Sequence, residues 1–132
     1  MHESVADSFL DALVPKVDAL VVGDPLDETT DVSALISTGE RERVESWIDE
    51  AVAAGAKVAT GGVERSGVLA PTVLTGVAPD MKVCSLEVFG PVVAVQTYRD
   101  VDDAFRLAND TRYGLQAAIF TRDLPLALRA AR

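Results

Sequence analysis

Apolar residues recur at three- and four-residue steps in two stretches of the first half of the chain, and this spacing predicts two amphipathic helices. In the first stretch, residues 3–21, they are Leu10, Leu13, Val14, Val17, Leu20 and Val21. Pro15 falls inside this stretch and has no backbone N–H, so it either kinks the helix or opens a second one. In the second stretch they are Val44, Ile48, Ala51 and Val52. Ser37 and Glu40 fit a capping box before the second helix, and Gly55 suits the left-handed residue beyond its end.

Three stretches rich in β-branched and small apolar residues predict strands. Lys57–Thr60 is stopped by two glycines, and Thr72–Thr75 follows Pro71, which places it at a sheet edge or makes the proline its first residue. Residues 92–98 open with an uninterrupted apolar run. Such a run is typical of a strand that is buried on both faces of a parallel sheet.

Helical and strand patterns alternate in the last third of the chain. Asp100 can cap a helix over residues 102–109, residues 115–120 read as a strand, and a further helix begins near Asp123. We expect the strands at 92–98 and 115–120 to be parallel neighbours with both helices packed on the sheet, which gives an α/β fold built of parallel βαβ units. No C-cap signal precedes Arg132, so we expect the domain to continue beyond it.

The composition narrows the classes of partner. The chain has 132 residues, is 48% hydrophobic and carries a formal net charge of −9, which argues against binding to nucleic acid or to an anionic membrane surface. It has no secretory signal pattern and no apolar run long enough to span a membrane. One cysteine and one histidine offer neither a disulfide nor a metal cluster, so we expect no metal and a cytoplasmic location.

Several short strings occur in one order along the chain: His2-Glu3-Ser4, Gly23-Asp24-Pro25-Leu26, Leu35-Ile36-Ser37, Gly55-Ala56-Lys57-Val58, Pro71-Thr72-Val73-Leu74, Glu87-Val88-Phe89-Gly90-Pro91-Val92, Ala108-Asn109-Asp110-Thr111 and Tyr113-Gly114-Leu115. Any one of them alone is weak evidence. Together, in this order and spacing, they resemble the NAD(P)-dependent aldehyde dehydrogenases. The resemblance covers essentially the whole chain, residues 1–132, and matches the later part of the family's catalytic domain.

The resemblance assigns cofactor-binding roles to two residues. In the family, the residue that matches Glu87 hydrogen-bonds the ribose next to the nicotinamide of NAD or NADP, and the one that matches Phe89 packs beside the nicotinamide ring. An ionised carboxylate accepts hydroxyl hydrogen bonds strongly, and an aromatic face restricts the ring. Gly90-Pro91 is then expected to form a tight turn that aims both side chains, with glycine taking the unusual dihedral angles. Taken alone, Glu87 would be a solvated carboxylate and Phe89 a core residue.

The resemblance also implies what this segment lacks. The glycine-containing nucleotide-binding half, the cysteine nucleophile, the general-base glutamate and the oxyanion-stabilising asparagine precede it in the family, and the strands used in oligomerisation follow it. Cys84 stands where the family has a small residue, so we interpret it as a buried small hydrophobe and assign no catalytic residue to this chain. Ser85-Leu86 replaces the charged residues that usually precede Glu87. This departure borders the ribose site.

Two functional hypotheses follow. In the first, the chain is part of an oxidoreductase that converts an aldehyde to a carboxylic acid with NAD⁺ or NADP⁺, contributes cofactor-positioning residues, and is inactive by itself. In the second, it is a non-catalytic domain, either a gene relic or a part that assembles with another chain. The partners we expect are a small-molecule aldehyde in the complete enzyme and, as one possibility, a second copy of the chain that binds through exposed apolar faces.

Overall fold

The centre of the molecule is a three-stranded sheet in the order β1-β4-β5, seen in a computed structural model that describes residues 1–131. β1 (Lys57–Thr60) runs antiparallel to β4 (Thr72–Thr75), and β5 (Val92–Val95) runs parallel to β4. A two-residue hairpin of β2 (Glu64–Arg65) and β3 (Val68–Leu69) lies between β1 and β4 in the sequence. The parallel pair β4 and β5 is joined through α3 (Lys82–Ser85), so the predicted α/β class is confirmed.

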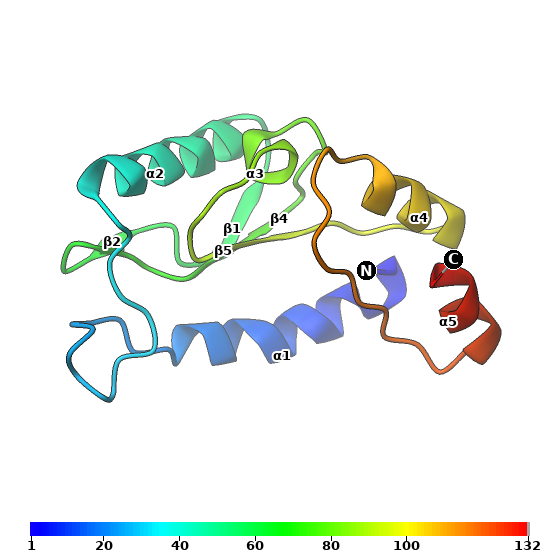
Figure 1. The fold of residues 1–132 in the computed structure, drawn as a ribbon, viewed down its shortest axis with the longest axis horizontal. Coiled ribbons are helices and arrows are strands. Elements are labelled where there is room, and N and C mark those ends of the chain that lie inside the picture. Colours follow the sequence, from blue (N-terminus) through cyan, green and yellow to red (C-terminus); the bar gives the residue numbers. More distant parts are fainter. Residues whose placement is uncertain (132) are drawn as a thin grey trace.

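Helices cover both sides of this sheet (Figure 1). α2 (Thr38–Ala53) and α3 lie on one side, and α1 (Ala6–Asp18), which follows the 3-10 turn η1 (Glu3–Val5), lies on the other. α1 is continuous and contains Pro15, so the alternative of a second helix opening at this proline is wrong. The helix ends one turn later, where the Ala19 N–H donates to the Pro15 carbonyl at 3.2 Å.

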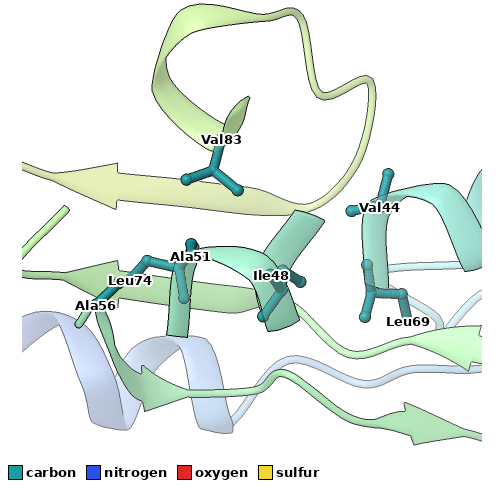
Figure 2. Packing of buried hydrophobic residues seen from close by; sticks show 7 residues of the cluster. All are labelled: Val44, Ile48, Ala51, Ala56, Leu69, Leu74 and Val83. Carbon is teal, nitrogen blue, oxygen red and sulfur yellow. The ribbon is translucent and has the colours of Figure 1, made fainter. Parts of the chain in front are cut away.

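The hydrophobic core forms where the apolar face of α2 meets the sheet (Figure 2). Its buried members are Val44, Ile48, Ala51, Ala56, Leu69, Leu74 and Val83. The first three are spaced four and three residues apart, which puts them on one face of the helix, as the sequence pattern predicts. Gly55 has φ +106°, as expected of a residue that ends a helix in the left-handed region.

The capping box before α2 forms only in part. The Ser37 hydroxyl accepts from the Glu40 N–H at 3.2 Å, as predicted. The Glu40 carboxylate does not return to the start of the helix, because it accepts two hydrogen bonds from the Arg43 guanidinium at 2.7 and 2.9 Å. A charged donor one turn along the helix competes successfully with a neutral backbone amide.

The strand that is buried in the structure is not the one that the sequence pattern predicts. β4 is the central strand and Thr72, Val73 and Leu74 are all buried, so its placement at an edge is wrong and Pro71 stands just before its first residue. In β5, Val95 is buried while Val93 is 53% exposed, so this strand is not buried on both faces. β5 also ends at Val95. Beyond it, the Gln96 carbonyl and the Tyr98 amide are bonded to Met1 and not to a strand continuing the sheet.

The expected strand at residues 115–120 is absent from the structure, and the prediction that it pairs with β5 is wrong. This segment runs as coil between α4 (Val101–Asn109) and α5 (Leu124–Ala130) and pairs with neither sheet, with Leu115 and Phe120 almost fully exposed. A strand forms only where a neighbour accepts its backbone hydrogen bonds, and the segment lies beside none of the described strands. Sequence periodicity cannot supply that neighbour.

The two C-terminal helices form as predicted but do not pack on the sheet. Asp100 and Asp123 cap them through their carboxylates. Neither helix has a buried residue, and they contact each other through an ion pair between Arg129 and Asp102 and through the Arg129 guanidinium, 5.0 Å from the Phe105 ring centroid. The expectation of sheet packing is therefore wrong. The expectation about the chain beyond Arg132 lies outside the described residues.

Candidate cofactor-binding loop

Glu87 and Phe89 lie on the loop of residues 86–91, which connects α3 to β5. Both side chains are exposed, Phe89 by 74%. Val88 between them packs against the core cluster. Val88 is packed inward while both of its neighbours stay exposed to solvent. The loop thus exposes a carboxylate and an aromatic ring close together in the sequence, and the interpretation of Phe89 as a core residue is wrong.

The backbone of this loop is bent at Phe89. Phe89 has φ +50°, and Gly90 is not in the left-handed region, so the unusual dihedral angle falls one residue before the glycine expected to adopt it. A left-handed conformation costs a non-glycine residue about 1–2 kcal/mol, and such strain tends to persist at functional sites. The turn closes through a hydrogen bond of 2.8 Å from the Val92 N–H to the Gly90 carbonyl. It is tied to β4 by the Thr72 N–H, which donates to the Pro91 carbonyl at 2.8 Å.

Gly90 lies close to the side chains of α2 and of the segment before it. A Cβ atom at this position would lie 3.5 Å from the Val44 methyl groups and 3.7 Å from Leu35. These are ordinary contact distances, so a small side chain would fit here and the packing does not require glycine.

Arg43 of α2 reaches the same loop. Its Nη2 donates to the Val88 carbonyl oxygen at 2.8 Å, although the two residues are 45 apart in the sequence. The sequence holds a signal for the local contacts of Arg43, because Glu40 and Trp47 stand three residues before and four residues after it. It holds none for the contact with Val88, which only the packing of α2 on the loop creates.

The Glu87 carboxylate has no hydrogen-bond partner among residues 1–131. An ionised carboxylate is an acceptor with room for several donors, and vicinal hydroxyls of a ribose can supply two. The exposed Phe89 ring offers a flat apolar surface to a planar heterocycle. The two exposed side chains therefore have the chemistry that a sugar and a planar ring would use: an acceptor for hydroxyl hydrogen bonds and a face for stacking.

Cys84 lies on α3, half-buried against the core cluster. Burial raises the pKa of the Cys84 thiol, the Asp80 carboxylate raises it further, and the hydrogen bond from Gln96 Nε2 to Sγ at 3.6 Å opposes this increase. Nucleophilic cysteines are instead found where a positive charge or a helix N-terminus lowers the thiol pKa. This environment suits the interpretation of Cys84 as a packing residue.

Two further features of residues 1–131 bear on the kind of site. No cluster of three or more histidine, cysteine, aspartate or glutamate side chains among them is arranged to hold a metal ion. None of their helices combines the length and the apolar character needed to cross a membrane.

A sequence model described as "Aldehyde dehydrogenase family" matches residues 1–132. The chain belongs to the aldehyde dehydrogenase family. The match covers the full length and thereby confirms the resemblance carried by the motifs.

Aldehyde dehydrogenases with similar sequences include a 3-sulfolactaldehyde dehydrogenase from Priestia aryabhattai, which is 47% identical over 132 residues. The alignment covers 100% of this chain and 28% of that protein. A lactaldehyde dehydrogenase from Methanococcus aeolicus is 37% identical over 128 residues, which are 97% of this chain and 27% of that protein. The chain thus spans about a quarter of the length of these relatives.

Solved structures of the family agree with this fold. Betaine aldehyde dehydrogenase from Staphylococcus aureus, in complex with NAD⁺, superposes with a TM-score of 0.89 at 37% identity and covers 98% of this chain and 27% of its own. Aldehyde dehydrogenase 21 from Physcomitrella patens, in complex with the product succinate, gives a TM-score of 0.93 at 38% identity, with 98% and 27% covered.

Proposed function

We propose that this chain contributes cofactor-positioning residues to the oxidation of an aldehyde to a carboxylic acid by NAD⁺ or NADP⁺. The observation that carries the proposal is the pair of outward side chains, Glu87 and Phe89, on either side of the anchored Val88. The names of the relatives and the NAD⁺ in a similar structure support it. Domain organisation follows the same proposal: residues 1–132 are part of a catalytic domain.

The two side chains have distinct tasks in this proposal. The nicotinamide cofactor accepts a hydride from the substrate. The Glu87 carboxylate accepts hydrogen bonds from the ribose hydroxyls and so fixes the position of the sugar, and the Phe89 ring limits the orientations open to the nicotinamide. Fixing orientation before the reaction removes part of the entropic barrier. The chain's own contribution is binding and orientation, and no residue in it acts as the nucleophile.

Replacing Glu87 by glutamine tests this role. Glutamine keeps the shape but exchanges a charged acceptor for a neutral one, and hydrogen bonds to charged groups contribute about 1.5–3 kcal/mol against about 0.5–1.5 for neutral ones. The expected loss of about 1–2 kcal/mol corresponds to a roughly five- to thirtyfold weaker affinity for NAD⁺ or NADH. Glu28→Gln, at an exposed loop carboxylate, is the matched control.

Affinity can be measured by titrating NAD⁺ and NADH against the isotope-labelled chain and following the amide resonances. Equal dissociation constants for the wild type and both variants would remove Glu87 from the cofactor site. The chain by itself is expected to produce no NADH or NADPH with a panel of aldehydes, because the covalent route needs a thiolate nucleophile. Turnover that is abolished by Cys84→Ser would contradict this.

The exposed apolar side chains of residues 113–128 favour a second candidate function, that of a non-catalytic part that assembles with another chain or a second copy of itself. Leu115, Phe120, Leu124 and Leu128 are all more than half exposed. Apolar surface gathered in one segment is typical of an interface. Sedimentation velocity on the wild type and on a Leu115→Ser, Phe120→Ser double variant tests this second function. An assembly held by this segment is expected in the wild type and should dissociate in the variant.

A further inference from the structure

Arg43 is fixed by three partners that come from different directions. Its Nε and Nη2 donate to Glu40 Oε2 at 2.9 and 2.7 Å, and its guanidinium lies 4.4 Å from the Trp47 ring centroid. Nη2 also donates to the Val88 carbonyl oxygen at 2.8 Å. A planar guanidinium has several donors in fixed directions and a face that stacks on aromatic rings, so it can satisfy all three partners at once.

We propose that Arg43 is a positioning residue for the loop of residues 86–91, and that it sets the directions of Glu87 and Phe89 through the Val88 carbonyl. The proposal rests on the cofactor-binding function proposed for those two residues. Arg43 acts in it through the loop backbone.

The hydrogen-bonding pattern of the loop shows why this one contact matters. The Leu86 N–H donates to the Lys82 carbonyl at 3.0 Å, and the Val92 N–H closes the turn at the other end. Between these two points, among the described residues, the bond from Arg43 is the one hydrogen bond made to residues 87–89. The Val88 carbonyl belongs to the peptide that joins Val88 to Phe89, so fixing it restricts Phe89 directly and Glu87 through Val88.

The backbone strain at Phe89 strengthens the need for an anchor. A non-glycine residue at φ +50° relaxes toward negative φ unless its neighbours hold it. The packed Val88 side chain holds the loop from one side, and Arg43 holds its carbonyl from the other. If the carbonyl is released, the peptide can rotate, and Phe89 then changes direction without any change in the core.

Two variants and one control test the proposal in the full chain. Arg43→Met keeps most of the side-chain volume and removes all the donors, and Arg43→Lys keeps the charge but offers a single point donor. Arg41→Met is the control, because Arg41 lies on the same helix and its ion-pair partners, Glu45 and Glu64, lie outside the loop. If Arg43→Met fails to fold, Arg43→Lys carries the test.

The first measurement is the order of the loop by NMR. Amide order parameters of residues 87–90 are expected near the rigid value of about 0.85 in the wild type and in Arg41→Met, and to fall toward about 0.6 in Arg43→Met. The ¹³C resonance of the Val88 carbonyl is expected to shift in both Arg43 variants and to stay in place in Arg41→Met. Loop order that is unchanged in the Arg43 variants, or that falls equally in Arg41→Met, would overturn the proposal.

The second measurement connects the loop to ligand binding, with nicotinamide mononucleotide as the probe because it carries only the ring, its ribose and one phosphate. Arg43→Met is expected to weaken its binding about tenfold in a background that has Glu87, and by much less in the Glu87→Gln background. If the losses of affinity caused by Arg43→Met and Glu87→Gln simply add, and the loop stays ordered in Arg43→Met, then Arg43 acts independently of Glu87 and the positioning role is refuted. If the wild-type chain shows no response to the probe, the proposed cofactor function fails, while the order parameters still decide the role of Arg43.

Discussion

Thr72 offers a test of how the central strand supports the site. It is the first residue of β4 and is 1% exposed. Its hydroxyl donates to the Ala70 carbonyl at 2.7 Å and accepts from the Gly62 N–H at 2.9 Å, and its own N–H donates to the Pro91 carbonyl of the loop. Thr72→Val keeps the size and branching of the side chain and removes both hydroxyl bonds.

The expected cost follows from the two groups that lose a partner. Ala70 is buried, so its carbonyl would stay unsatisfied, at about 1–3 kcal/mol. Gly62 is partly exposed, so water can replace the hydroxyl there and the loss is about 0.5–1.5 kcal/mol. We expect Thr72→Val to lower the free energy of unfolding by about 2–4 kcal/mol, a large part of the stability of a small domain.

Urea unfolding followed by the fluorescence of Trp47, the single tryptophan, measures this change. Thr75→Val is the control on the same strand, because Thr75 is partly exposed and makes no side-chain hydrogen bond within residues 1–131; a change within about 0.5 kcal/mol is expected. Thr72→Ser keeps the hydroxyl and should cost about 1 kcal/mol for the lost methyl group. If Thr72→Val lowers the free energy of unfolding no more than Thr75→Val does, the two hydrogen bonds of the Thr72 hydroxyl are not important for stability.

Three further predictions concern the core, the thiol and an exposed carboxylate. Ile48→Ala should destabilise the chain by about 2–5 kcal/mol in the same urea assay, because Ile48 is buried in the centre of the α2 face. Since burial raises the pKa of the Cys84 thiol, iodoacetamide should alkylate it more slowly at pH 8 than it alkylates an unfolded variant of the chain; equal rates would contradict its packing role. The hydrogen bond from the Gly67 N–H, and after it the Arg41 guanidinium, lower the pKa of the Glu64 carboxyl. The ionised carboxylate therefore stabilises the folded chain at pH values above the ordinary carboxyl pKa. This stability is lost as the pH falls through the lowered pKa of Glu64 in the folded chain. The stability difference between the wild type and Glu64→Gln, measured by urea unfolding at several pH values, should therefore be present at pH 7 and vanish in acid.

Local patterns in the sequence predict most of the helices and their ends. The apolar spacing at Val44, Ile48 and Ala51 identifies the buried face of α2, and Ser37 and Gly55 mark its two ends. These features depend on residues within one or two helical turns, where spacing alone decides which side chains share a face. The family was also recognisable at this level, because its motifs are short strings in a fixed order.

Contacts between distant residues decided the rest. Residues 115–120 have the composition of a strand, yet they are not a strand here because a strand depends on the hydrogen bonds of a neighbour. The left-handed angle falls on Phe89 and not on Gly90, because the loop must meet β4 through Pro91 while Val88 packs in the core. The sequence by itself determined which residues could form helices, which face of α2 is apolar and to which family the motifs belong. Only the tertiary structure determined the exposure of Glu87 and Phe89 and the hydrogen bond from Arg43 to Val88. These features depend on contacts between residues far apart in the sequence, such as Arg43 and Val88, which are 45 residues apart, and no periodic sequence pattern predicts such contacts.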